Sequence, residues 1–286
     1  MGSRARAISI ILFRIIIAVT VVMLFSISKP SLAATPVISW TPGGITVTVA
    51  TGDSAEVDVK FSSKIKLNNA TLFIVPELQP FITITPSSFA SISAGAENSV
   101  RLAISIPPTT PLGIYDGTVH LRVANRTYPQ TLKVTLQVGQ AISSQGGTVT
   151  SSDGLATVNI PPGAIPIESL YDDDVITVTI IPTSDTPPAG FGTAIGTSYD
   201  FGPSGYEFSR PVTITMQYDP FKIPSGVPET HIRVAMEVNG QWVGLPDSIV
   251  DTINHQISGR TNFTLRDSRL LNLLTKRQIQ NPISTL

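Results

Sequence analysis

Residues 55–61 read Ala-Glu-Val-Asp-Val-Lys-Phe, a stretch in which apolar and polar side chains alternate strictly. An extended chain points successive side chains to opposite faces, so this segment has one apolar face and one charged face. The same alternation occurs at Ile45–Val49 and Gly117–Val123, and Pro, Gly, Asn and Asp separate such segments every 8–12 residues or so. Helical periodicity is nearly absent. The pattern predicts an all-β protein of two tandem antiparallel β-sandwiches.

The first predicted sandwich covers residues 34–138 and contains seven strands, as an immunoglobulin-like domain does. The expected strands are Ile45–Val49, Ala55–Phe61, Thr71–Val75, Phe81–Thr85, Ser99–Ile106, Gly117–Val123 and Gln130–Val138. The chain has no cysteine, so this would be a disulfide-free variant. Residues 106–119 resemble a strand–turn–strand element of bacterial extracellular immunoglobulin-like modules, in which prolines end one strand and Gly113 shapes the corner before Tyr115.

The polar segment 139–145 is the clearest change in composition and is interpreted as a linker. A second sandwich is expected over residues 146–268, with strands at 148–150, 156–160, 175–181, 197–201, 212–218, 232–238, 241–245 and 256–265. Residues 269–286 form a C-terminal tail, in which the leucine-rich stretch Arg269–Arg277 is expected to form a short helix.

Three motifs of the second half occur in a characteristic order. They are a Gly-Gly opening, an Ile-Pro-Pro-Gly-Ala strand exit, and the hairpin Gly-Pro-Ser-Gly-Tyr-Glu-Phe-Ser-Arg-Pro-Val at 202–212. Together they resemble the ZU-five domain, the β-sandwich of zonula-occludens proteins, netrin receptors and ankyrins. The motif residues are Gly146, Gly147, Pro161, Pro162, Gly163, Ala164, Gly202, Pro203, Gly205, Phe208 and Pro211. The resemblance implies a non-enzymatic domain that docks against other domains or proteins.

Some relatives of this domain cleave their own chain before the serine of a His-Phe-Ser motif. The matching stretch here is Asn262-Phe263-Thr264, where Thr264 would be the nucleophile. Asn262 replaces the histidine that would activate this hydroxyl, and Phe263 is equally explained by packing in a core. Self-cleavage between Phe263 and Thr264 is therefore kept as a remote alternative.

The N-terminus has the features of a signal peptide over residues 1–33. Arg4, Arg6 and Arg14 precede the apolar run Ile15–Phe25, and Ser31-Leu32-Ala33 provides the small residues that a signal peptidase recognises. We expect cleavage after Ala33 and export to the cell envelope or the exterior. The alternative is an uncleaved membrane anchor over Ile8–Phe25, which would contain Arg14 at a considerable cost in free energy.

The net charge of −1 is distributed unevenly along the chain. Residues 1–33 contain four basic and no acidic residues, so the chain that follows has a net charge of −5. Residues 34–138 have a net charge of +1 and residues 140–268 one of −9. An acidic module repels polyanions, so nucleic acid is not an expected partner, and membrane contact is expected only through an uncleaved leader. The expected partner is an unidentified protein or surface polymer.

Few residues of the chain suit catalysis or cofactor binding. There are three histidines, His120, His231 and His255, and none lies in a recognisable catalytic motif. The residues around them therefore predict no catalytic, cofactor-binding or metal-binding residue. Asp172–Asp174 is interpreted as a solvated turn, with weak calcium binding as the alternative.

The sequence therefore predicts a non-enzymatic interaction or structural module that is secreted or displayed on the cell surface, most simply one that binds a protein. A carbohydrate- or cell-wall-binding accessory module is the alternative, since Trp40 and Trp242 are possible sugar platforms.

Overall fold

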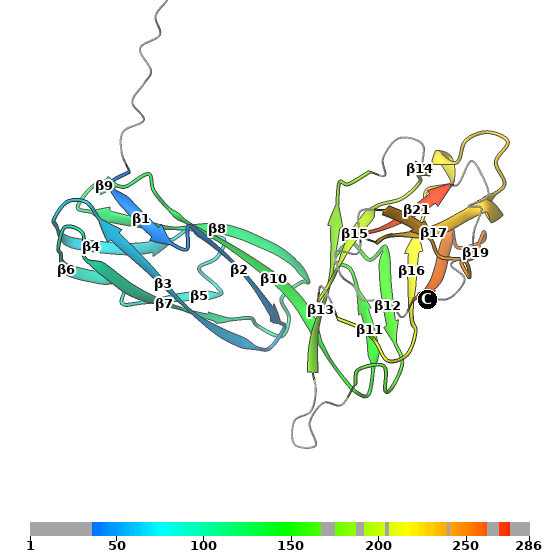
Figure 1. Ribbon diagram of the computed structural model, residues 1–286, viewed down its shortest axis with the longest axis horizontal. Coiled ribbons are helices and arrows are strands. Elements are labelled where there is room, and N and C mark those ends of the chain that lie inside the picture. The colour runs from blue at the N-terminus through cyan, green and yellow to red at the C-terminus, as the bar shows by residue number, and fades with distance from the viewer. Residues whose placement is uncertain are drawn as a thin grey trace, which may run out of the picture. The chain divides into compact units, whose positions relative to one another are not determined.

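The computed structural model describes residues 36–166, 175–186, 192–203, 206–238, 241–261 and 269–274, most of which lie in β-strands (Figure 1). The prediction of an all-β sandwich protein is confirmed. The leader expected over residues 1–33 lies outside the described residues. Within the described part of the chain, no helix has the length and apolar character needed to cross a membrane.

The strands of the N-terminal half are β1 (Ile38–Thr41), β2 (Gly44–Ala50), β3 (Ser54–Ser63), β4 (Leu67–Ile74), β5 (Ile82–Thr85), β6 (Ser88–Ile92), β7 (Glu97–Ser105), β8 (Gly113–Val123), β9 (Arg126–Thr127) and β10 (Leu132–Ser143). The strands of the C-terminal half are β11 (Gly147–Thr150), β12 (Ala156–Ile160), β13 (Val175–Thr183), β14 (Thr193–Ala194), β15 (Ser198–Gly202), β16 (Val212–Gln217), β17 (Ile232–Val238), β18 (Gln241–Gly244), β19 (Ile249–Asp251), β20 (Gln256–Thr261) and β21 (Arg269–Leu274). Two 3₁₀ turns, η1 (Pro220–Lys222) and η2 (Glu229–His231), connect strands of the second half.

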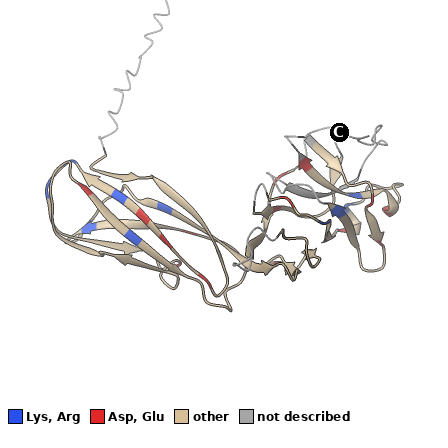
Figure 2. Ribbon diagram, turned by 60° about the horizontal axis from the view of Figure 1, so that its bottom comes forward, with Lys and Arg blue, Asp and Glu red and all other residues tan. Residues whose placement is uncertain are grey.

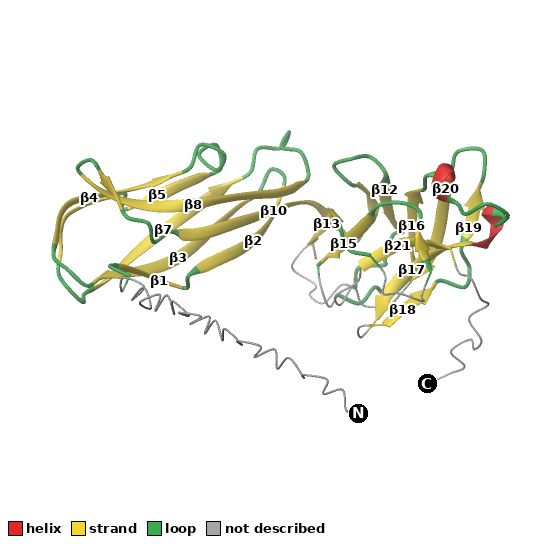
Figure 3. Ribbon diagram, turned by 90° about the horizontal axis from the view of Figure 1, so that it is seen from above, coloured by secondary structure: helices red, strands yellow, loops and turns green. Residues whose placement is uncertain are grey.

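Two sheets enclose the core of the N-terminal half (Figure 3). One has the order β1-β3-β7-β5, and the other has the order β2-β10-β8-β4-β6, with β9 added to β8. Every pairing in them is antiparallel except that of β2 with β10, which is parallel. The alternation that predicts the fold holds at the core, where Val59 and Phe61 are 0% and 1% exposed and Asp58 and Lys60 face solvent.

Both edges of this sandwich are formed by a chain segment that changes sheets at a proline. Pro42 separates β1 from β2, and Pro86 separates β5 from β6; the peptide bond before each proline is cis. Proline has no N–H to donate to a ladder, so a strand is interrupted there and can resume in the opposite sheet. Short edge strands of this kind also limit pairing with other chains.

Tyr115 fixes the corner that leads into β8. Its hydroxyl donates a hydrogen bond to the carbonyl of Pro111 at 2.9 Å, and its ring lies edge-on to Phe81 at 5.0 Å between centroids. A tyrosine that bonds back to the backbone a few residues upstream is the tyrosine corner of immunoglobulin-type sandwiches. Tyr115 is the third residue of β8 and pairs with Leu136, so the strand begins at Gly113, before the start that the sequence predicts at Gly117.

The C-terminal half contains the five-stranded sheet β11-β12-β16-β20-β19. The strands β18-β17-β21-β15-β13 form a second series that continues into β10, and β14 pairs with β21. A separate hydrophobic core, formed by residues between Ile142 and Ile257, joins these strands. Its largest fully buried side chains are Tyr199 and Phe201, each 1% exposed.

The structure differs from the sequence interpretation in two segments. Residues 139–143, which were expected to belong to a linker, are the end of β10, and residues 140–143 pair with Val175–Val178 of β13. The small polar residues of this segment give no strand pattern in the sequence, although Ile142 among them is buried. The helix expected at the start of the tail is wrong, because Arg269–Leu274 forms β21 between β15 and β17. Backbone pairing on both sides outweighs the helix propensity of leucine.

Candidate ligand groove

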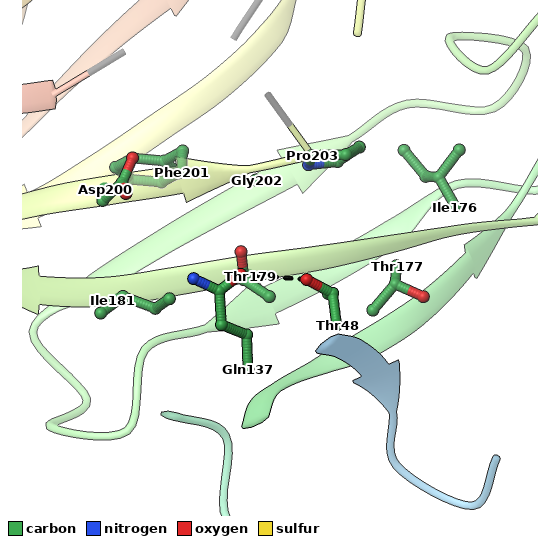
Figure 4. A pocket seen from close by; sticks show the side chains of 10 residues that line it. All are labelled: Thr48, Gln137, Ile176, Thr177, Thr179, Ile181, Asp200, Phe201, Gly202 and Pro203. Carbon is green, nitrogen blue, oxygen red and sulfur yellow. Dashed lines mark hydrogen bonds between the residues drawn. The ribbon is translucent and has the colours of Figure 1, made fainter. Parts of the chain in front are cut away.

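An open groove of about 510 Å³ lies where β2, β10, β13 and β15 meet (Figure 4). Its polar lining consists of Thr48 from β2, Gln137 from β10, Thr177 and Thr179 from β13, and Asp200 from β15. Its apolar lining includes Ile176, Ile181 and Pro203. The four strands come from distant parts of the sequence, so the groove exists only in the folded chain.

Strand alternation accounts for the side chains that face the groove. Thr177, Thr179 and Ile181 occupy alternate positions of β13, so they share one face. Thr179 pairs with Gly202 and Ile181 pairs with Asp200 across the ladder, which places β15 residues on that same face. The intervening Val178 and Ile180 point the other way, into the C-terminal core, and Ile176, near the start of β13, contacts both this core and the groove. One face of these strands thus forms the groove while the other stabilises the fold.

Two glycines allow the close approaches that shape the groove. A Cβ at Gly139 of β10 would lie 2.6 Å from the carbonyl oxygen of Val178 and 2.7 Å from Cγ2 of Thr177. A Cβ at Gly202 would overlap Oγ1 of Thr179. Both positions therefore require glycine for lack of space, and neither has a positive φ.

The groove presents a mixed set of hydrogen-bonding groups. Thr48 Oγ1 donates to Gln137 Oε1 at 2.9 Å, which orients the amide and leaves its nitrogen as a donor of two further bonds. Asp200 adds an exposed carboxylate that accepts hydrogen bonds and attracts cations. Such a lining suits a ligand with amide, hydroxyl or amino groups, such as an extended peptide, alongside a small apolar contact.

The predicted Gly-Gly opening and the strand exit pack against each other. Gly146 has a φ of +74°, and a Cβ there would lie 2.8 Å from the carbonyl carbon of Pro161 and 2.9 Å from the nitrogen of Pro162. At Gly147 a Cβ would lie 3.0 Å from Ile142 Cδ1. These residues shape the backbone where β11 begins and β12 ends.

The exit then turns the chain back into the core. Gly163 has a φ of +70° and donates its N–H to the carbonyl of Ser144 at 2.8 Å. Ala164 follows and is fully buried. Arg210 closes the turn by donating from Nη1 to the carbonyl of Pro162 at 3.1 Å.

The residues of the hairpin motif lie in different environments. Gly202 and Pro203 line the groove, and Gly205 lies outside the described residues. Phe208 is buried and packs edge-on against Tyr206 at 5.2 Å, whereas Pro211 is exposed just before β16. Sequence reasoning therefore found the residues that shape the second half and missed the groove residues Thr48, Gln137, Thr177 and Thr179. For Thr177 and Thr179 a signal exists in the polar face of the Val-Ile-Thr-Val-Thr-Ile strand at 175–180.

His120 is half-buried on the outer face of β8. Its ring stacks on Phe73 at 5.1 Å, and its Nε2 lies 2.8 Å from Thr118 Oγ1. Burial and the nearby guanidinium of Arg122 lower the pKa of His120. Nδ1 has no hydrogen-bond partner within the described part of the chain, so no carboxylate seen here orients the ring as a triad requires.

His255 belongs to a second contact group in the C-terminal half. Its Nδ1 lies 3.9 Å from Glu229 Oε2, which also accepts a hydrogen bond from the hydroxyl of Tyr218. Burial and this bond to Glu229 raise the pKa of Tyr218. The group ties η2 to the end of β16 and the turn before β20. His231, at the end of η2, is exposed.

The remaining sequence candidates do not form an exposed site. Trp40 is 9% exposed and donates from Nε1 to the carbonyl of Gln130 at 3.3 Å, and Trp242 is 5% exposed, so neither ring is free to stack on a sugar. Asp172–Asp174 and Asn262–Thr264 lie outside the described residues. In the part of the chain that is described, no three His, Asp or Glu side chains gather as a metal site would require.

Tyr199 and Asp153 link the core to the turn between β11 and β12. Tyr199 donates its hydroxyl to Asp153 Oδ2 at 2.8 Å, while Ser151 Oγ at 2.6 Å and the Leu155 N–H at 3.0 Å donate to Oδ1. Burial alone would raise the pKa of Asp153, but these hydrogen bonds together hold it below its ordinary value. The ionised carboxylate therefore stabilises the folded state.

Replacing Tyr199 by phenylalanine should lower the free energy of unfolding by about 1–2 kcal/mol at neutral pH. The depressed folded-state pKa of Asp153 means that its contribution is complete above its unfolded pKa of about 3.9 and is lost as the pH falls through the folded-state value. The difference between wild type and variant should therefore shrink in acid. Urea unfolding at pH 7 and pH 3 tests this. Tyr128→Phe is the control and should show no such pH dependence.

Comparisons with known proteins do not reveal a family. No family model and no curated protein matches the sequence. Similar solved structures include a family 123 glycoside hydrolase from Clostridium perfringens (17% identity, TM-score 0.28), aligned over 34% of this chain and 23% of that one. A protein of unknown function from Porphyromonas gingivalis W83 aligns over 82% of this chain and 81% of its own, with 10% identity and a TM-score of 0.32. The E. coli chaperone DraB aligns over 57% of this chain and 87% of its own, with 10% identity and a TM-score of 0.29. The aligned region thus spans less than a quarter of the hydrolase, and scores this low support no functional argument.

Proposed function

We propose that this protein is a non-enzymatic binding module, secreted or displayed on the cell surface, that holds a partner protein in the groove between β2, β10, β13 and β15. The observation that carries the proposal is the groove's lining, in which Thr48 orients the amide of Gln137 opposite the accessible hydroxyl of Thr177 and the carboxylate of Asp200. A peptide offers the N–H, C=O and amino groups that such a lining can bond.

The resemblance to the ZU-five domain supports the same proposal. Its glycines and prolines have backbone roles that a Cβ or a different φ would disrupt at Gly146 and Gly163. A domain of that family would dock against other domains or proteins. Two residues of the hairpin motif, Gly202 and Pro203, lie in the groove itself, so the motif and the proposed site overlap.

A site-specific crosslinking experiment tests the groove. A photoreactive residue is placed at Thr177 in the groove or at Thr213, a control position on β16 in the five-stranded sheet, and the chain is exposed to surface extract from the source cells. We expect one protein adduct from Thr177 and none from Thr213. The dissociation constant for the identified partner should rise at least about tenfold in Thr177→Arg and stay unchanged in Thr213→Arg, since a long cation fills the groove only in the first.

Two outcomes would contradict this proposal. Equal adducts from both positions, or equal affinity of both arginine variants, would show that the groove does not select the partner. Binding to insoluble polysaccharide that Thr177→Arg abolishes, with no protein adduct, would favour the carbohydrate- or wall-binding alternative.

A further inference from the structure

Cationic side chains gather at one end of the N-terminal half, which we call the basic pole. It consists of Lys64, Ile65 and Lys66 in the β3–β4 loop, Arg122 at the end of β8, and Arg126 at the start of β9. The pairing of Ala70 with Val123 brings the start of β4 beside the end of β8, so these segments share one end of the sandwich. All five side chains are exposed.

The cations of the basic pole have no carboxylate partners among the described residues. Among the described residues, the lysine and arginine that form ion pairs are Lys60 and Arg101, and neither belongs to the pole. The carboxylate nearest the pole along the strands, Glu97, is held by Lys60 at 2.9 Å. In Figure 2 the blue segments of this half extend from this end of the sandwich toward its middle, where red segments lie among them. The pole thus presents four positive charges without a carboxylate partner in the described part of the chain, of which Arg122 lies over the Phe73 ring at 4.2 Å and Arg126 over the Tyr128 ring at 5.0 Å.

Ile65 adds an apolar side chain between two of these charges. It is 46% exposed, and the neighbouring Ser63, only 1% exposed, holds its backbone. Ser63 Oγ donates to the carbonyl of Ile65 at 2.8 Å and accepts from its N–H at 3.3 Å. This local bonding presents a Lys-Ile-Lys tip outward. An apolar residue flanked by cations fits a lipid interface, where it can enter the acyl boundary while the cations meet phosphates.

The described part of the chain also begins at this pole, at Pro36. Lys64 donates its N–H to the carbonyl of Val37 at 2.9 Å, and Ile38 pairs with Ser63. The apolar run of the leader ends at Phe25, so the ten intervening residues 26–35 span at most about 35 Å. A leader still held in a membrane would therefore keep the basic pole close to that membrane's surface.

We propose that the basic pole docks on anionic phospholipid headgroups, with Ile65 entering the interface. The acidic residues that give the segment 140–268 its net charge of −9 are repelled by the same surface, which favours contact through the N-terminal half. This inference goes beyond the proposed partner binding and uses no residue of the groove, so each can fail without the other.

Vesicle sedimentation tests the docking. Residues 36–286 form one compact unit, so the chain from Ala34 is used and the leader cannot contribute to partitioning. Vesicles contain phosphatidylcholine alone or with about 30% phosphatidylglycerol, at low ionic strength. We expect binding to the anionic vesicles only. The double variant Lys64→Glu/Lys66→Glu should reduce the partition coefficient at least about 20-fold, because each cation near such a surface contributes about fivefold.

Two further comparisons serve as controls. The first distinguishes an effect of the pole from an effect of the protein's net charge, and the second distinguishes lipid from other polyanions as the partner. Lys222→Glu/Arg260→Glu makes the same charge change at exposed residues of the C-terminal half and should reduce partitioning far less; an equal reduction would overturn the proposal. Ile65→Ser should lower vesicle binding severalfold and leave retention on immobilised polyphosphate unchanged. If Ile65→Ser binds vesicles like wild type, the pole has no lipid contact and an anionic polymer is its partner. All variants change exposed side chains, and an unchanged Tm confirms folding.

Discussion

Replacement of Phe61 by alanine is expected to lower the free energy of unfolding of the N-terminal half by about 3–5 kcal/mol. The ring is 1% exposed and lies between Trp40, at 5.2 Å, and Phe89, which it meets edge-on at 5.3 Å. Truncation removes both aromatic contacts and leaves a cavity that two paired sheets cannot collapse to fill. Denaturant unfolding followed by tryptophan fluorescence measures the loss, since Trp40 reports on this core.

Phe221→Ala is the matched control for this prediction. The same atoms are deleted from a side chain that is 96% exposed, so the free energy of unfolding should change by no more than about 0.5 kcal/mol. A small effect at Phe61, comparable to that at Phe221, would mean that the alternation in β3 does not place Phe61 in a tightly packed core.

Gly146→Ala is expected to destabilise the C-terminal half by about 2–5 kcal/mol. The residue has a φ of +74°, where a Cβ costs about 1–2 kcal/mol. The new Cβ would also press on backbone atoms of Pro161 and Pro162, at 2.8 and 2.9 Å, and on the carbonyl oxygen of Ile160 still more closely. Overpacking against backbone typically costs a further 1–3 kcal/mol or so. Urea unfolding monitored by circular dichroism gives the total.

Gly154→Ala separates the two causes. Its φ is +73°, nearly the same as that of Gly146, but no atom lies within 4 Å of the added Cβ. It should therefore show only the conformational cost of about 1–2 kcal/mol. Equal effects in the two variants would show that the Gly-Gly motif serves its backbone angle and not the close contact with the Pro-Pro exit.

Alternation along the chain predicts the strands that line the cores. Val57, Val59 and Phe61 share the inner face of β3, and Val158 and Ile160 do the same in β12, because period two alone decides which side chains point inward. Alternation does not predict the edge strands β1 and β6, because each is short and lies close to a proline. Alternation does not predict β21 either, because its leucines show no period of two. Its extended conformation depends on backbone pairing with β15 and β17.

The residues that form the tight turns can likewise be predicted from the sequence. The positive φ values of Gly146 and Gly163 and the burial of Ala164 follow from the glycine and proline spacing that the motifs display. The segment against which each turn packs cannot be predicted in this way. That Gly146 packs on the Ile160–Pro162 backbone depends on the pairing of β11 with β12, in which Gly147 lies opposite Ile160.

The sequence by itself determined the all-β class, the inward faces of most strands and the residues at the tight turns, because these depend on side-chain period and backbone preference within a few neighbours. Only the tertiary structure decided the groove and the basic pole. Thr48, Gln137, Thr177 and Asp200 meet because four strands pair in a particular register. Lys64 and Lys66 share one end of the sandwich with Arg122 only through the pairing of β4 with β8. Pairing between distant strands is a property of the whole fold, and no local pattern specifies it.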